Sequence, residues 1–162
     1  MEIFIWTCEN IRKQPDGLPV IDDHVWHIII RGYGEPDQSS DVFTTLCNYA
    51  GIRAFYALAH TQDQKNLLPL SFVKIRNKWV IFDPYRKVYF KDRNGGIADI
   101  GALKNNNWVI HTRGEQPDIN YSPYLKELPS VIEASLIRDS IQSPLNRLLF
   151  EIKKRTRLKT GR

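Results

Sequence analysis

Cysteine is scarce in this sequence, and its apolar runs are short. Cys8 and Cys47 are the only cysteines among 162 residues, and their spacing is not that of metal ligands. This excludes a disulfide-dense scaffold, and in an intracellular protein we expect both thiols to be reduced. No apolar run approaches the about 20 residues that a membrane-spanning helix requires. The first residues, MEIFIWTCENIRK, lack the basic region and cleavage site of a secretory signal, so we expect a cytoplasmic protein.

Repeats and low-complexity tracts are also lacking, which makes one globular domain the expected organisation. The chain is 42% hydrophobic and 25% charged, as is usual for globular proteins. Its length is sufficient to bury roughly two thirds of the surface that the unfolded chain exposes. We assign residues 1–146 to the body and residues 147–162 to a basic C-terminal helix or tail of the same domain.

The net charge of +5 is concentrated near the C-terminus. Residues 147–162 contain seven Lys or Arg and one Glu, which leaves 16 basic and 17 acidic residues in the first 146. The overall pI is therefore no sign of nucleic-acid binding, and we do not expect nucleic acid as a partner.

The basic segment also has the pattern of an amphipathic helix. Ser143 can cap it, Pro144 can open it, and Leu145, Leu148, Leu149, Ile152 and Thr156 follow at helical spacing. Two interpretations stay open. The apolar stripe packs against the domain, which we favour, or the segment contacts an anionic membrane surface or the acidic groove of a partner.

Two helices are predicted before residue 33. The first lies within residues 3–13, where Ile3, Trp6 and Ile11 suggest a helical face, and QPDG ends it. The second lies in DDHVWHIIIRG, with Asp22 or Asp23 as its N-cap and Gly32 as its terminator.

The third predicted helix gives the clearest pattern. Pro36 suits its first position, and Asp37 lies in its first turn. Its apolar stripe runs up to Gly51 and consists of Val42, Phe43, Leu46, Cys47 and Ala50.

After this helix the pattern changes to short strands of an antiparallel sheet. We predict strands at 52–59, 70–75, 78–85 and 87–90, a loop with a helical turn at 94–106, a strand at 108–112 and an irregular connection at 113–124. A two-residue turn at Arg76 and Asn77 would place residue 70 opposite residue 83.

Two stretches resemble one known family. RGYGEPDQSSDVFTTLCNYAGIRA followed by LSFVKIRNKWVIFDPY is similar to the transglutaminase-like superfamily, where GYGxCDQ opens the nucleophile helix, AGI ends it and HxFVxx…KWxxxDP supplies histidine and aspartate. The resemblance covers residues 3–85. It implies an α+β, papain-like fold in which N-terminal helices, including the nucleophile-type helix, pack on a small antiparallel sheet, with a C-terminal helix.

The resemblance also implies where catalytic residues would stand. The cysteine of the family falls on Pro36, its histidine on Leu70 and its aspartate on Asp83, so only Asp83 keeps a reactive group. A helix start activates a thiolate, and proline and leucine supply neither thiol nor base. We therefore predict a pseudoenzyme that binds a peptide or another polar ligand, with Tyr33, Pro36, Gln38, Leu70 and Asp83 as candidate ligand-binding residues.

Two other functions are alternatives to a pseudoenzyme. An active member with displaced residues would perform acyl transfer or amide hydrolysis, yet Cys47 lies about 16 Å along the helix from Pro36. Ser39 and Ser40 are closer but lack a base. An accessory protein that binds an anionic surface through its basic tail is the third alternative.

The remaining polar residues have simpler explanations. His24 and His27 lie near Asp22 and Asp23 but lack a third, separated ligand, and His60 and His111 belong to no motif, so we expect neither a metal nor a cofactor. Asp83 in an Asp-Pro turn more commonly accepts backbone N–H groups than it binds a ligand.

Overall fold

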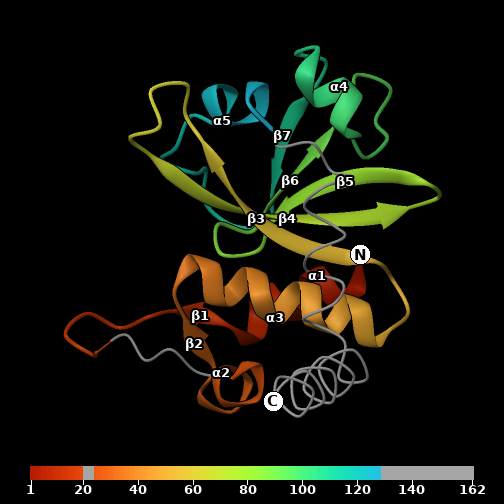
Figure 1. The fold of residues 1–162 in the computed structure, drawn as a ribbon. Helices are drawn as coiled ribbons and strands as arrows, with labels where there is room; N and C mark the ends of the chain where they lie inside the picture. The colour runs from red at the N-terminus through yellow and green to blue at the C-terminus, as the bar shows by residue number, and fades with distance from the viewer. Residues whose placement is uncertain (20–23, 129–162) are drawn as a thin grey trace, which may run out of the picture. The chain divides into compact units, whose positions relative to one another are not determined.

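The computed structural model describes residues 1–19 and 24–128, which form a mixed α+β unit. Its centre is an antiparallel sheet in the order β3-β4-β5-β6-β7. Helices α1 to α3 lie on one side of this sheet, and the short helices α4 and α5 lie on the other (Figure 1). The predicted C-terminal helix at residues 143–156 lies outside the described residues.

Helix α1 (Glu2–Asn10) confirms the first predicted helix, although its buried face differs from the expected one. Phe4, Thr7 and Cys8 are buried, whereas the side chain of Trp6 is 39% exposed. Residues three and four apart share a helix face, and the row of Phe4, Thr7 and Cys8 is the one that meets the sheet. Trp6, one of the residues from which the helix was predicted, therefore lies outside this buried row.

Helix α2 (Val25–Arg31) ends at Gly32 as predicted, with φ of 74° in the left-handed region that glycine adopts readily. Its N-cap is His24, whose Nδ1 accepts a hydrogen bond from the backbone N–H of Trp26 at 3.4 Å. The assignment of the cap to Asp22 or Asp23 was therefore wrong. Before and after α2, β1 (Arg12–Lys13) pairs in parallel with β2 (Tyr33–Gly34).

Helix α3 (Pro36–Tyr49) begins at Pro36, as predicted, and its N-cap is Glu35. Val42, Phe43 and Cys47 of the predicted stripe are buried, Leu46 is half-buried and Ala50 is exposed. The buried face also includes polar residues that hydropathy alone does not select, namely Gln38, Ser39, Ser40 and Thr44.

The sheet follows the predicted order with different ends. Its strands are β3 (Ala54–His60), β4 (Leu67–Ile75), β5 (Lys78–Asp83), β6 (Val88–Lys91) and β7 (Val109–Thr112). Strand β4 begins before the predicted Leu70 and includes Pro69. Because the pairing of β4 with β5 ends at Ser71, proline needs no ladder partner on that side.

Two short helices complete the described fold. Helix α4 (Ile100–Lys104) is the predicted helical turn, and Asp99 caps it through a 2.9 Å hydrogen bond from the N–H of Ala102. Helix α5 (Ser122–Lys126) lies in a stretch predicted to be wholly irregular. Its Ser-Pro start was the missed signal.

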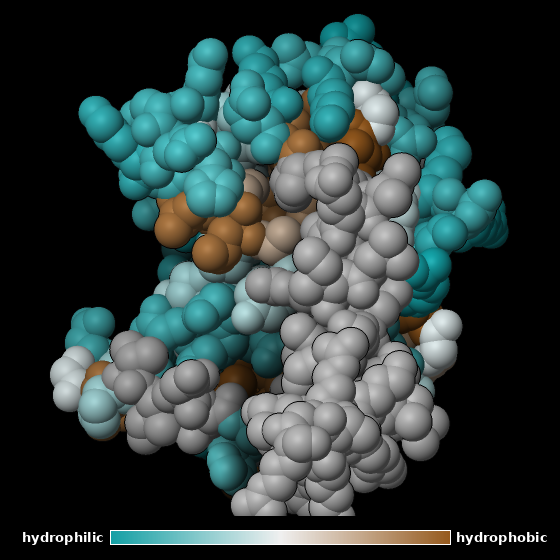
Figure 2. Space-filling view, viewed as in Figure 1, coloured by the Kyte–Doolittle hydropathy of each residue, from teal (hydrophilic) through white to brown (hydrophobic). Residues whose placement is uncertain are grey.

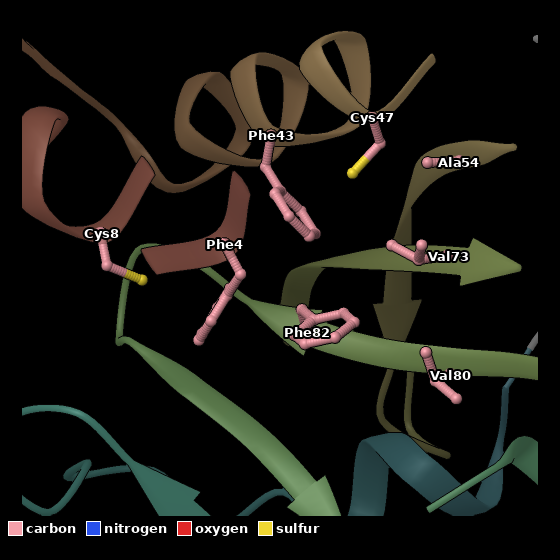
Figure 3. Packing of buried hydrophobic residues seen from close by; sticks show 8 residues of the cluster. All are labelled: Phe4, Cys8, Phe43, Cys47, Ala54, Val73, Val80 and Phe82. Carbon is pink, nitrogen blue, oxygen red and sulfur yellow. The ribbon is translucent and has the colours of Figure 1, made fainter. Parts of the chain in front are cut away.

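The core between the sheet and helices α1 and α3 is rich in aromatic contacts. Phe4, Cys8, Phe43 and Cys47 meet side chains from β3, β4 and β5 there, as Figure 3 shows for Ala54, Val73, Val80 and Phe82. The ring of Phe82 lies 4.9 Å from that of Phe4 and 5.3 Å from that of Phe43. This cluster fixes α3 against one face of the sheet.

The outer surface is mainly hydrophilic in the view of Figure 2, with an apolar area over the β3–β4 hairpin. Leu58 and Leu67 of this hairpin are 40% and 53% exposed. Within residues 1–19 and 24–128, no helix has the length and apolar character needed to cross a membrane.

Candidate functional site

The start of α3 is built around Gln38. Its Oε1 accepts hydrogen bonds from the backbone N–H of Glu35 at 3.0 Å and from Nη2 of Arg31 at 3.1 Å. Gly34 packs closely on it, since a Cβ there would lie 3.0 Å from the same Oε1. Gln38, a candidate ligand-binding residue, is thus engaged within the fold and only 8% exposed.

Tyr33 and Pro36 flank this arrangement. The carbonyl of Tyr33 accepts a 2.9 Å hydrogen bond from Nε of Arg31, whose guanidinium lies 5.2 Å from the centre of the Tyr33 ring. Pro36, half-buried at the first helical position, offers no N–H and no nucleophilic atom. The helix start therefore keeps its capping chemistry without a reactive group.

The predicted hairpin has the expected register. Arg76 and Asn77 both adopt positive φ, at 46° and 67°, as a two-residue type I′ turn requires. The pairs run from Ile75↔Lys78 to Ser71↔Phe82, and residues 70 and 83 are the next positions in this register, just beyond the last pair. The predicted turn and register of the hairpin are confirmed.

The pair at 70 and 83 faces away from α3, however. Phe82 and Val73 point toward α1 and α3, and successive side chains on a strand alternate between the faces. Leu70 and Asp83 must therefore point to the opposite face, where α4 and α5 lie. Leu70 and Asp83 therefore do not share the sheet face on which α3 packs.

Asp83 forms a buried polar network on that opposite face. It is 1% exposed, and its Oδ2 accepts hydrogen bonds from Oη of Tyr121 at 2.7 Å and from Nη1 of Arg86 at 3.1 Å. Its Oδ1 accepts from the backbone N–H of Arg86 at 3.1 Å. This is the structural role for an Asp-Pro turn, extended by two side chains.

Sequence reasoning missed both side-chain partners of Asp83. Arg86 follows three residues later in DPYR, a local spacing that could have indicated it. Tyr121 is 38 residues away and had no signal. Burial first, and then the negative charge of Asp83, raises the pKa of Tyr121, so its hydroxyl stays a hydrogen-bond donor.

The other predicted site residue on this face, Leu70, is fully buried and stands opposite Ala57 of β3. It lines no accessible surface, so it cannot contact a ligand from solvent in this structure. Its apolar side chain suits the core it occupies.

Neither thiol is poised to react. Cys8 and Cys47 are 3% and 2% exposed, and burial raises the pKa of each to about 12. The Sγ of Cys8 donates to the carbonyl oxygen of Pro84 at 3.5 Å. Thiolate formation at neutral pH is therefore strongly disfavoured at both positions.

The hydroxyl groups near the start of α3 are also buried. Ser39 is 1% exposed and Ser40 is fully buried, and neither Oγ has a hydrogen-bond partner. No base of the described part of the chain is hydrogen-bonded to either of them. Among residues 1–19 and 24–128, no group of three His, Cys, Asp or Glu side chains could hold a metal ion.

An open cleft of about 520 Å³ lies next to the turn that follows Asp83. It is lined by Lys13, by Tyr85 to Lys87 and by residues 114–118. None of the five predicted ligand-binding residues lines it. The pKa of Tyr85 is raised by burial first and then by the carboxylate of Glu35, which places the start of α3 within electrostatic reach of this cleft.

Comparisons with known proteins leave the family open. No protein-family model matches the chain, and no curated protein matches it. One solved structure with some likeness is described as "a Putative Cysteine Protease from Cytophaga hutchinsonii". The likeness has a TM-score of 0.45 and 18% identity, and covers 69% of this chain and 39% of that one. The α+β class rests on the described elements themselves, and the likeness adds no argument about activity.

Proposed function

We propose that this protein is a catalytically inactive, transglutaminase-like domain that binds a peptide or another polar ligand. The sequence resemblance supports the family, and the composition of the candidate site supports the inactivity. The inactivity is supported further by the direction of the side chains at 70 and 83, which do not point toward α3.

The observation that carries the proposal is that the carboxylate of Asp83 is already hydrogen-bonded within the fold. Asp83 is the one retained residue of the three that the resemblance implies, and Tyr121 and Arg86 already occupy its carboxylate. A carboxylate that orients a catalytic imidazole must be free to accept from it. Asp83 instead stabilises the turn between β5 and β6.

The binding part of the proposal is supported by the cleft beside this turn. Its size falls in the range of about 300 to 1,000 Å³ that is usual for ligand sites. Its lining is polar and charged, which favours a polar ligand over an apolar one.

The inactivity is tested by assaying the purified protein for amide hydrolysis and for amine incorporation into a glutamine-containing peptide. We expect no turnover above buffer between pH 6 and pH 9, because no described nucleophile meets a base. Turnover that disappears in Ser39→Ala, Ser40→Ala or Cys47→Ala, with the fold intact by circular dichroism, would establish an active enzyme with displaced residues.

A further inference from the structure

The cleft beside Tyr85 combines charges of both signs from different parts of the chain. Its cations, Lys13, Arg86 and Lys87, come from β1 and from the turn between β5 and β6. Its carboxylates, Glu115 and Asp118, come from the segment that follows β7.

The cations gather around one aromatic ring. Nζ of Lys13 lies 5.6 Å and Cζ of Arg86 lies 5.5 Å from the centre of the Tyr85 ring. Both distances are within the range of cation–π attraction, which holds two like charges near the same surface. A negatively charged group placed between them would relieve their repulsion.

Within the part of the chain that the structure describes, most of these charges form no ion pair. Arg86 pairs with Asp83 at 3.1 Å, but Lys13, Lys87, Glu115 and Asp118 form no ion pair with any residue of the described part of the chain. The cations come from β1 and the turn between β5 and β6, and the carboxylates come from the segment after β7. The cleft therefore offers groups that can pair with an anionic and with a cationic group of a ligand.

The backbone supports this separation. The carbonyl of Lys87 accepts a 3.0 Å hydrogen bond from the N–H of Arg113, which ties the two walls together. Gly114 leaves room for the stem of Lys87, since a Cβ at that position would lie 3.4 Å from its Cδ. The stem of Lys87 therefore lies against this wall of the cleft.

We propose that this cleft binds a short zwitterionic peptide, with the ligand carboxylate toward Lys13 and Lys87 and the ligand ammonium toward Glu115 and Asp118. Three extended residues span at most about 10 Å, a length that a cleft of this volume accommodates. The inference rests on the proposed binding function and assigns it a place and a ligand class.

The experiment is an NMR titration of the isotope-labelled full chain at low salt with three probes. Triglycine carries both charges, N-acetyltriglycine carries only the carboxylate, and triglycine amide carries only the ammonium. We expect amide resonances of residues 85–87 and 114–118 to shift, with triglycine binding most tightly.

Charge-removing variants show which side chains bind the carboxylate end of the peptide and which bind its ammonium end. In Lys13→Met/Lys87→Met, triglycine and N-acetyltriglycine should bind about three- to tenfold more weakly, and triglycine amide should be unaffected, as expected for exposed charge pairs. In Glu115→Gln/Asp118→Asn, triglycine and triglycine amide should weaken, and N-acetyltriglycine should not. Lys65→Met/Lys104→Met, which changes exposed lysines outside the cleft, is the matched control.

Equal affinity for the three probes, or the same response of both double variants to every probe, would overturn the inference. Shifts confined to the surroundings of Tyr33 and Gln38 would place binding elsewhere and reject the cleft while keeping a binding function. If no resonance moves, the cleft is rejected, and the proposed inactivity is then judged by the turnover assay alone.

Discussion

At the scale of single residues, the buried polar groups decide what Asp83 does. A carboxylate that is 1% exposed must be satisfied by hydrogen bonds, and three donors from Arg86 and Tyr121 provide them. The Tyr121 hydroxyl is fully buried with the carboxylate, so neither group can exchange its partner for water.

Removing the Tyr121 hydroxyl should therefore be costly. We expect Tyr121→Phe to lower the free energy of unfolding by about 1 to 3 kcal/mol, because one lone pair of Asp83 is left without its donor. Urea unfolding measures the change. Tyr124→Phe in α5, which Tyr121 caps, is the matched control, because it removes no hydrogen bond to a described residue, and its effect should stay below about 0.5 kcal/mol. Equal effects of the two variants would remove Asp83 from the stabilising network.

The buried thiol of Cys47 gives a dependence of stability on pH. Burial raises its pKa from 9.0 to about 12 in the folded protein, so its contribution is fully present below pH 9 and is lost as the pH rises toward 12. Between pH 8 and pH 10, the native protein should lose about 1.4 kcal/mol relative to Cys47→Val. Urea unfolding at both pH values measures this difference. A stability difference that does not change with pH would show that the thiol is not desolvated.

At the scale of elements, the start of α3 is determined by neighbouring residues. Pro36 at the first helical position and Glu35 before it could be read from the sequence because both act within one helical turn. The role of Gln38 follows from the same turn, in which its side chain reaches back to the N–H of Glu35.

The side chain of Gln38 should therefore stabilise the folded protein. Gln38→Ala removes the acceptor of Glu35 and Arg31 at a site that is 8% exposed, and we expect a loss of about 1 to 3 kcal/mol in the free energy of unfolding. Pro36→Ala should change it by less than about 1 kcal/mol, since either residue is accepted at a first helical position. The reverse order of effects, measured by thermal and urea unfolding, would contradict this account of the helix start.

The elements also show which features the sequence could predict. The strands, the turn at Arg76 and Asn77 and the register of residue 70 with residue 83 depend on local alternation and turn chemistry, and all three were predictable. Which face of the sheet α3 covers depends on the packing of Phe82 against Phe4 and Phe43, contacts between distant segments that periodicity does not encode. The partner of Asp83 at Tyr121 was missed for the same reason.

At the scale of the whole described unit, the sheet separates the parts of the presumed site. Pro36 belongs to the helical layer that includes α1 and α3, and Leu70 and Asp83 point into the layer of α4 and α5. The open cleft near Tyr85 lies at the end of β5, where the chain leaves the sheet. Binding at this edge requires no rearrangement of the sheet.

The most direct test of this separation is the thiol pKa at position 36, measured from the alkylation rate as a function of pH in Pro36→Cys and in Pro36→Cys/Leu70→His. The positive end of α3 should lower the pKa of the new thiol below its usual value near 8.5. Because residue 70 faces the opposite side of the sheet, we expect the added histidine to leave that pKa unchanged, with both variants folded by circular dichroism. A further decrease of one pH unit or more in the double variant would contradict the account, because it would show an imidazole beside the helix start and a site that two substitutions can restore.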